Sequence, residues 1–252
     1  MTQISSKVLK GGALLGDARR LVEVWDIEES TDDNLRRISD GNLLAKNSRA
    51  RTADVLKYVL RPRFVAPGPR VIAALRLLLQ QPSAFSEACY YEACRDDRLI
   101  AEYAEGPLFD WYRAGRTTVT LEETVHWLAV MAAEGRIGSW NATVQIKVAR
   151  GLLAALRDFG VLQGANIKRF ATPRLSPAGF AYVAFRLHEQ DVSSRALLGS
   201  RVWRRWLLDE PRVVELFIQA ERLGVLSYSQ AGSLVRIDWK AASLEDVARA
   251  AA

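Results

Sequence analysis

The chain has 252 residues, 49% of them hydrophobic, so it can bury a core and does not have the composition of a disordered protein. Its formal net charge is +6 and its sequence pI is about 9.5, values that favour an anionic partner. The longest uncharged run, 223–235, is too short for a membrane-spanning helix, which needs roughly 20 apolar residues, and we expect no membrane partner.

The N-terminal half predicts a succession of helices. Apolar residues recur at helical spacing over 13–25, and N-cap chemistry at Thr31 and Ser48 predicts two further helices, the second ending before Pro62. We assign residues 1–115 to an N-terminal helical domain in which 31–63 form a first helix-turn-helix. The remaining helices of this half are predicted over 71–80, 82–94 and 96–114, the last broken at Gly106-Pro107.

The chain then changes character at GRTTVT, residues 115–120, which predicts a linker. Helices are predicted over 121–134 and over 139–159, where Ser139 is the expected N-cap. A hairpin follows, with strands at Val161–Gln163 and Lys168–Thr172. Two helices and a hairpin are the succession of a winged helix-turn-helix, and we assign residues 116–192 to this unit.

A weak internal repeat predicts a second winged-helix-like unit over residues 193–252. LRDFGVL at 156–162 resembles ERLGVL at 221–226, and both end a helix at glycine before a valine-leucine strand. A second hairpin is predicted, with strands at Val225–Tyr228 and Leu234–Trp239. The expected fold is mainly α: a compact helical protein with helix-turn-helix or winged-helix units and one or two small β-hairpin wings.

Basic residues gather in two stretches. Residues 46–70 contain seven basic residues and one acid, and residues 135–206 contain twelve basic residues and three acids. Most of the basic residues are arginine, whose planar fork suits bidentate contacts with phosphate and guanine. The clusters predict a surface for a polyanion, and a merely solvated basic face is the alternative.

The 139–159 helix carries the sharpest candidate site. Val148, Leu152 and Leu156 lie on a broad apolar face, and small polar and basic residues gather within roughly 80° on the other side. The second helix of a helix-turn-helix enters the major groove, so we expect this helix and the hairpin after it to contact double-stranded DNA. An ordinary amphipathic core helix is the alternative. The candidate DNA-binding residues here are Thr143, Lys147, Arg150, Arg157, Lys168, Arg169 and Arg174.

The 31–63 stretch carries a second set. Its second helix is expected to bury Ala53, Leu56, Val59 and Leu60 and to turn basic residues outward. A solvated helix is again the alternative. The candidate DNA-binding residues are Lys46, Arg49, Arg51, Lys57, Arg61 and Arg63.

The 193–252 unit is a poorer DNA reader, because its helix at 210–223 carries Glu215 and Glu221, which would repel phosphate. We expect Trp203 and Trp206, which lie one helix earlier among arginines, to belong to the core.

The sequence holds no recognisable catalytic centre. Its two histidines lie far apart, and no metalloprotease, Walker A or nucleophile-elbow motif is present. Asp96 and Asp97, flanked by arginines, are expected to be ion-paired surface residues. Cys89 and Cys94 are expected to be buried, reduced thiols. With no apolar signal region in MTQISSKVLKGG, we expect a cytoplasmic, non-enzymatic protein without metal or cofactor.

Several segments resemble a known family. KGGALLGDARRLVEVW near the N-terminus, the NLLAKNSRARTADVL block and the RPRF that follows are similar to BrxA, a core component of bacteriophage exclusion (BREX) defence systems. The later region ending in TPRLSPAGF is compatible with the same family. The resemblance implies a mostly helical protein that binds duplex DNA beside other BREX components, including a site-specific DNA methyltransferase. It implies no catalytic motif.

Two other functions stay open at this stage. A basic helix also suits RNA, although the narrow major groove of A-form RNA excludes a recognition helix. Alternatively, the units bind proteins and the chain is a scaffold of the defence complex, with the mixed charges of 193–252 as the better docking site.

Overall fold

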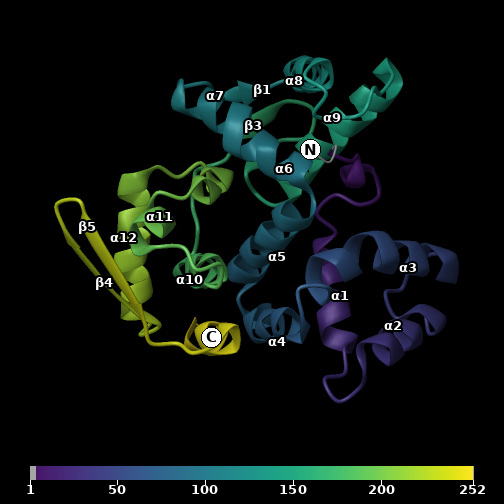
Figure 1. Ribbon diagram of the computed structural model, residues 1–252. Helices are drawn as coiled ribbons and strands as arrows, with labels where there is room; N and C mark the ends of the chain where they lie inside the picture. Colours follow the sequence, from purple (N-terminus) through teal and green to yellow (C-terminus); the bar gives the residue numbers. More distant parts are fainter. Residues whose placement is uncertain (1–3, 252) are drawn as a thin grey trace.

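The computed structural model describes residues 4–251, and helices dominate it from end to end, as expected (Figure 1). The N-terminal segment contains the short helix η1 (Lys7–Leu9). The helices that follow are α1 (Leu15–Val24), α2 (Thr31–Asp40), α3 (Arg49–Val55), η2 (Leu56–Val65), α4 (Pro69–Leu77), η3 (Leu78–Gln80) and α5 (Pro82–Asp96).

Two expectations for this group are corrected. The N-cap of α2 is Ser30, whose hydroxyl accepts the Asp33 N–H at 3.2 Å, and not Thr31. The helix capped by Ser48 does not stop before Pro62: α3 runs directly into η2, a π-helix that contains this proline. Proline lacks an N–H and crowds the preceding turn of an α-helix, and the wider π turn accommodates it.

The middle of the chain forms a three-stranded sheet with helices around it. The elements are α6 (Arg98–Tyr103), η4 (Ala104–Leu108), α7 (Phe109–Arg113), β1 (Thr118–Val119), α8 (Leu121–Ala133), α9 (Ala142–Asp158), β2 (Leu162–Gln163) and β3 (Lys168–Phe170). The strand order is β1-β3-β2, both pairs antiparallel. The expected order of helix, helix and hairpin is confirmed.

The expected linker at 115–120 is wrong, because it contains β1, in which Val119 pairs with Lys168 of β3. The N-cap of α9 is also corrected: Asn141, not Ser139, accepts the Val144 N–H, at 2.9 Å. The expected break at Gly106 is confirmed by its non-helical backbone. Helices α6 and α7 pack on this unit: the hydroxyl of Tyr103 on α6 lies 2.8 Å from that of Thr124 on α8, and the ring centroid of Tyr112 on α7 lies 5.5 Å from that of Phe170 on β3.

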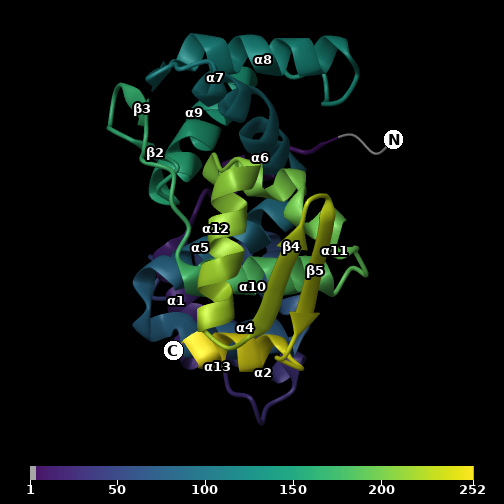
Figure 2. The ribbon, with the colours of Figure 1, turned by 90° about the vertical axis from the view of Figure 1, so that its left-hand side faces the viewer.

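The C-terminal elements are α10 (Pro177–His188), α11 (Ser194–Leu198), η5 (Arg201–Trp206), α12 (Glu210–Arg222), β4 (Leu226–Ala231), β5 (Leu234–Trp239) and α13 (Leu244–Ala251). The second hairpin is confirmed, with Leu226 opposite Trp239. Figure 2 shows α10, α12 and this hairpin on one side of the molecule. Helix α13 closes the chain against α4 and α10. Trp203 and Trp206 are buried, as expected.

Helix α5 is the centre of the molecule, and its buried Glu92 joins it to α10 of the C-terminal elements. The Glu92 carboxylate accepts the Tyr182 hydroxyl at 3.0 Å and the Arg186 Nε at 2.9 Å, and it pairs with Arg95 at 2.7 Å. A buried charge is tolerated when it is paired and hydrogen-bonded, as it is here. The buried apolar residues of the N-terminal, middle and C-terminal elements also belong to one continuous core.

Candidate nucleic-acid interface

Helix α9 presents a free cationic face. Val148, Leu152 and Leu156 bury its opposite side, as the sequence predicts. Among the described residues, Lys147 and Arg150 are exposed and form no hydrogen bond or ion pair, and the exposed Thr143 lies one turn before Lys147. Arg157 is exposed but pairs with its neighbour Asp158 at 2.6 Å. An unpaired cation on a rigid helix loses no partner when it meets a phosphate.

The hairpin beside α9 divides its two basic residues between different roles. Arg169 is exposed in β3, and its guanidinium has no hydrogen bond or ion pair within the part of the chain that the structure describes. Lys168 is buried, and its amine donates to the carbonyl oxygens of Gly164, at 2.9 Å, and Ala165. Lys168 therefore holds the hairpin turn and does not belong to the exposed set of candidate DNA-binding residues.

Helix α9 and the hairpin share one groove. A hollow of about 350 Å³ is lined by Arg150 and Ala154 of α9 and by Ala165 and Asn166 of the hairpin turn. The helix and the hairpin therefore face the same space. A ligand that lay along α9 would contact both, which is the arrangement that the sequence predicts.

The second predicted set, on α3 and η2, is partly exposed. Leu56, Val59 and Leu60 are buried as expected, but Ala53, expected beside them, is exposed. Arg49, Lys57 and Arg61 point to solvent and make no ion pair among residues 4–251, and the Lys57 amine lies 5.1 Å from the Tyr58 ring centroid. The remaining members have partners inside the protein. Lys46 pairs with Asp17, and the exposed Arg51 donates to the Lys10 carbonyl at 3.5 Å.

Arg63 is corrected: it is buried, with 1% of its surface exposed, and is not an exposed cation past the end of a helix. Its guanidinium donates to the carbonyl oxygens of Gly12, at 2.7 Å, and Gly11, at 3.0 Å. Burial lowers its pKa, because desolvation disfavours the charged form. Arg63 therefore fixes the N-terminal segment. It lies within η2 and not past its end, because the helix continues through Pro62.

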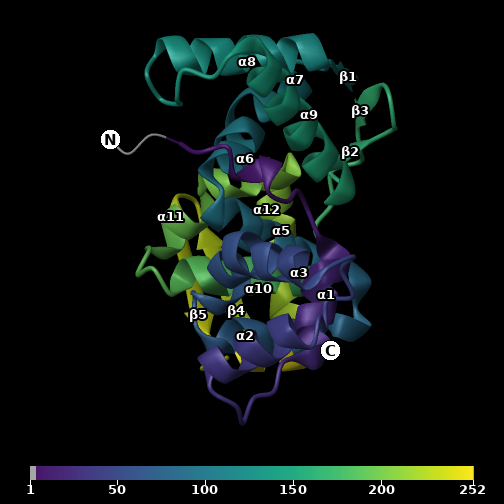
Figure 3. The same cartoon turned by 90° about the vertical axis from the view of Figure 1, so that its right-hand side faces the viewer.

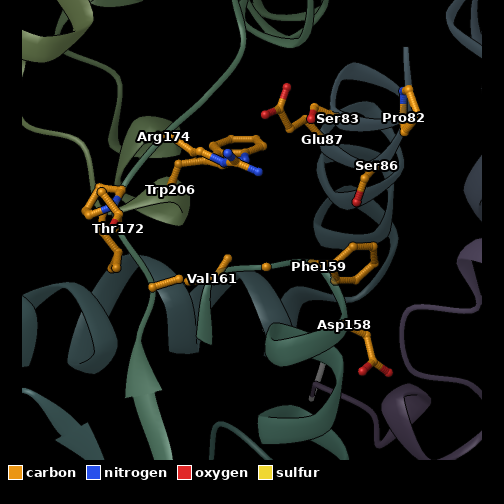
Figure 4. A pocket seen from close by; sticks show the side chains of 14 residues that line it. Pro82, Ser83, Ser86, Glu87, Asp158, Phe159, Val161, Thr172, Arg174 and Trp206 are labelled. Carbon is orange, nitrogen blue, oxygen red and sulfur yellow. The ribbon is translucent and has the colours of Figure 1, made fainter. Parts of the chain in front are cut away.

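Arg174 lies away from the hairpin, in the wall of a cavity of about 260 Å³ between α5, the end of α9 and η5 (Figure 4). Glu87 of α5 and Trp206 of η5 line the same cavity. The Glu87 carboxylate accepts the Ser176 hydroxyl and the Ser176 N–H, the latter at 3.0 Å, and burial raises its pKa. This carboxylate is occupied in holding the N-terminus of α10.

The C-terminal unit carries paired charges, which agrees with its expected weakness as a DNA reader. Arg195 pairs with Glu210 at 2.8 Å, Arg212 pairs with Glu215, and Arg236 pairs with Asp238 at 2.7 Å. An acid beside each of these cations opposes phosphate binding.

Two residues of the α3 and η2 surface are not indicated by the sequence. Lys10 lies with its amine 5.2 Å from the Tyr58 ring centroid, so both belong to the basic surface of α3 and η2. Their shared site depends on the path of the N-terminal segment, for which the sequence holds no signal. The expectation that Asp96 and Asp97 are ion-paired surface residues is corrected. Asp97 is buried, and Asp96 forms an ion pair, with Lys7 at 2.6 Å, but its side chain is only 7% exposed.

The described residues offer no group of three or more His, Cys, Asp or Glu arranged to hold a metal ion. Cys89 and Cys94 are free thiols inside the core, and burial raises the pKa of Cys94 to about 12. Within 4–251, none of the helices has the length and apolar character needed to cross a bilayer.

Comparison with known proteins relates the chain to a family and to a solved structure. A family model described as BrxA matches residues 3–186. The fold is similar to the crystal structure of an uncharacterized protein from Magnetospirillum magneticum, with a TM-score of 0.61 and 18% sequence identity over 81% of this chain and 98% of that one. At this identity the likeness shows the fold alone. No curated protein matches the chain.

Proposed function

Because the chain belongs to the BrxA family, whose members are components of BREX phage-defence systems, we propose that it binds double-stranded DNA for such a system without catalysing a reaction itself. The unpaired cationic face of α9, set beside the hairpin groove, is the observation that carries this proposal. In this reading β1, α8, α9, β2 and β3 form a winged helix-turn-helix, and α9 is its recognition helix.

The chemistry of this face favours duplex DNA. The major groove of B-DNA admits an α-helix, whereas that of A-form RNA does not. Lys147 and Arg150 supply charge, and Thr143 supplies a hydroxyl, but α9 turns no asparagine or glutamine to the same face. Those amides are the usual readers of adenine, so we propose low sequence selectivity, with most of the affinity coming from phosphate contacts.

The test is the double substitution Lys147→Ala and Arg150→Ala. Both side chains are exposed and alanine favours helix, so the fold should remain intact. If the two residues contact phosphates, the salt dependence of binding loses about 0.9 log units of slope for each. Fluorescence anisotropy with a random-sequence duplex at several salt concentrations measures this, and circular dichroism checks the fold.

The matched control is Arg222→Ala with Lys240→Ala, which removes the same charge from exposed positions of the C-terminal unit. We expect this control to bind DNA like the unmodified protein. Equal affinity and equal slope for the α9 double variant and the unmodified protein would show that α9 does not face DNA. A duplex RNA of the same length, if it competed as well as DNA, would favour an RNA-binding protein.

A second function is supported for the C-terminal unit, which we propose docks another BREX component, with the methyltransferase as the first candidate. Ile218 on α12 is 41% exposed and Leu234 at the hairpin tip is 76% exposed, among charges that are already paired. Exposed apolar side chains favour a protein partner over phosphate. Ile218→Asp with Leu234→Asp should abolish co-elution with that partner and leave DNA binding unchanged.

A further inference from the structure

Building on the proposed DNA binding, we infer that α9 and the α3–η2 helix form one continuous surface that a single duplex contacts along its length. The N-terminal strap, defined as residues 4–12, joins them. Figure 3 shows the strap crossing the molecule with α9 on one side and α1 and α3 on the other. The strap contacts both helices, so it determines how α9 and η2 lie relative to each other.

One edge of the strap lies against α9 and against the turn that precedes it. At its start, Ile4 bridges to Ile137 in the turn between α8 and α9, and the Ile4 N–H donates to the Arg136 carbonyl at 3.0 Å. Further on, Val8 lies so close to Gly151 that an added Cβ there would be 3.4 Å from a Val8 methyl group. The small residues of α9 therefore seat the strap on the flank next to its cationic face.

The other edge of the strap is fixed to η2. Arg63 holds the carbonyl oxygens of Gly11 and Gly12 from inside the core, and a Cβ at Gly11 would lie 3.0 Å from Val59. On the surface, the Lys10 amine lies over the Tyr58 ring, which the Lys57 amine also approaches. The strap therefore brings its own exposed lysine to the basic residues of η2.

These contacts place the two cationic sets close together on one side of the molecule. On α9, Lys147 lies one helical turn before Gly151, so the two residues are neighbours on the helix surface. Gly151 lies against Val8, which is two residues before Lys10 in the strap. Figure 1 and Figure 3 agree that α9 and α3 lie on the side away from the α12 hairpin unit. A rigid body with two cationic helices on one side binds a single stiff rod better than two separate ones, because the second contact needs no new association step.

The experiment compares duplex lengths. We use anisotropy with duplexes of about 10 and about 30 base pairs and three variants: Lys147→Ala with Arg150→Ala, Lys57→Ala with Arg61→Ala, and the Arg222→Ala with Lys240→Ala control. On the long duplex each of the first two should reduce the salt slope by about 1.8, so that a fourfold rise in salt costs the unmodified protein about tenfold more affinity than either variant. The control should not change.

On the short duplex the η2 variant should lose about as much as on the long one, because the two cationic sets lie close together and about 10 base pairs already extend roughly 34 Å. Titration at concentrations well above the Kd should give one long duplex per protein. Two long duplexes per protein, or an η2 variant that is silent at both lengths, would overturn the single surface while DNA binding stood. Absence of any salt-dependent binding to either duplex would overturn the proposed function itself.

Discussion

Single residues show how burial changes the role of a charge. Asp97 is 1% exposed, and its Oδ1 accepts the Leu99 N–H at 3.1 Å at the N-cap of α6. Its Oδ2 has no hydrogen-bond partner among the described residues. Burial raises the pKa of this carboxyl to about 6, against the usual 3.8, because desolvation disfavours the charged form.

The raised pKa predicts a pH-dependent stability. The folded state binds the Asp97 proton more tightly than the unfolded state does. Protonation of Asp97 therefore adds to the free energy of unfolding in full below about pH 4, and this contribution is lost as the pH rises through about 6. The shift corresponds to at most about 3 kcal/mol. Asp97→Asn keeps an acceptor for Leu99 and removes the titration. Urea unfolding between pH 4 and 7 should show the unmodified protein losing stability relative to the variant, and parallel curves would contradict this.

Asp54 is the exposed acid on the basic face of α3 and η2, three residues before Lys57 and seven before Arg61, and it forms no ion pair within residues 4–251. We predict that Asp54→Asn tightens DNA binding about two- to fivefold at low salt, with the gain disappearing at high salt, because it removes a screened repulsion of phosphate. Asp110→Asn, an equal charge change on α7, is the control. An unchanged affinity would place this face away from DNA.

At the scale of elements, local patterns and long-range packing divide the predictions. The apolar period of α9 and the glycine that ends it are local, and the helix and hairpin were predictable to within a few residues. Strand β1 exists because Val119 pairs with Lys168, 49 positions along the chain, and two residues give no strand pattern of their own. The π-helical passage through Pro62 likewise depends on the core around it.

The site divides in the same way. Helical spacing places Lys147 and Arg150 on one exposed face, and the structure confirms that exposure. Sequence spacing gives no information on where a long side chain finds a partner. It therefore predicts Lys168, Arg63 and Lys46 to be free cations, although carbonyl oxygens hold the first two and a carboxylate holds Lys46. Arg205 is a further example: it is buried and pairs with Glu105 at 2.7 Å, and its sequence neighbours do not indicate this partner.

The hairpin turn beside α9 gives a prediction at this scale. Gly164 has a φ of +95°, and a Cβ there would lie 2.2 Å from the Ile167 carbonyl oxygen. Gly164→Ala should therefore cost on the order of 1–3 kcal/mol of unfolding free energy. Gly16→Ala, in the first turn of α1 where a Cβ meets nothing, should be neutral or stabilising by up to about 1 kcal/mol. Urea denaturation of both variants measures the difference, and equal stability would contradict the tight turn.

At the scale of the whole molecule, charge is sorted by its pairing. The side that carries α9, the strap and α3 holds a group of exposed cations without ion pairs, whereas within the described part of 193–252 five of the nine basic residues pair with carboxylates. The buried Glu92 network and the contact of α13 with α4 hold these sides in one core. This arrangement lets one side bind a polyanion while the other stays available to a protein.

The measurement that tests this account most directly is the salt dependence of binding between the unmodified protein and a random duplex DNA of about 30 base pairs. If Lys57, Arg61, Lys147, Arg150 and Arg169 each neutralise one phosphate, the logarithm of the association constant should fall against the logarithm of salt concentration with a slope of about −4.5. Anisotropy between about 50 and 300 mM salt gives this slope. A flat response, or equal binding of duplex RNA, would contradict the account.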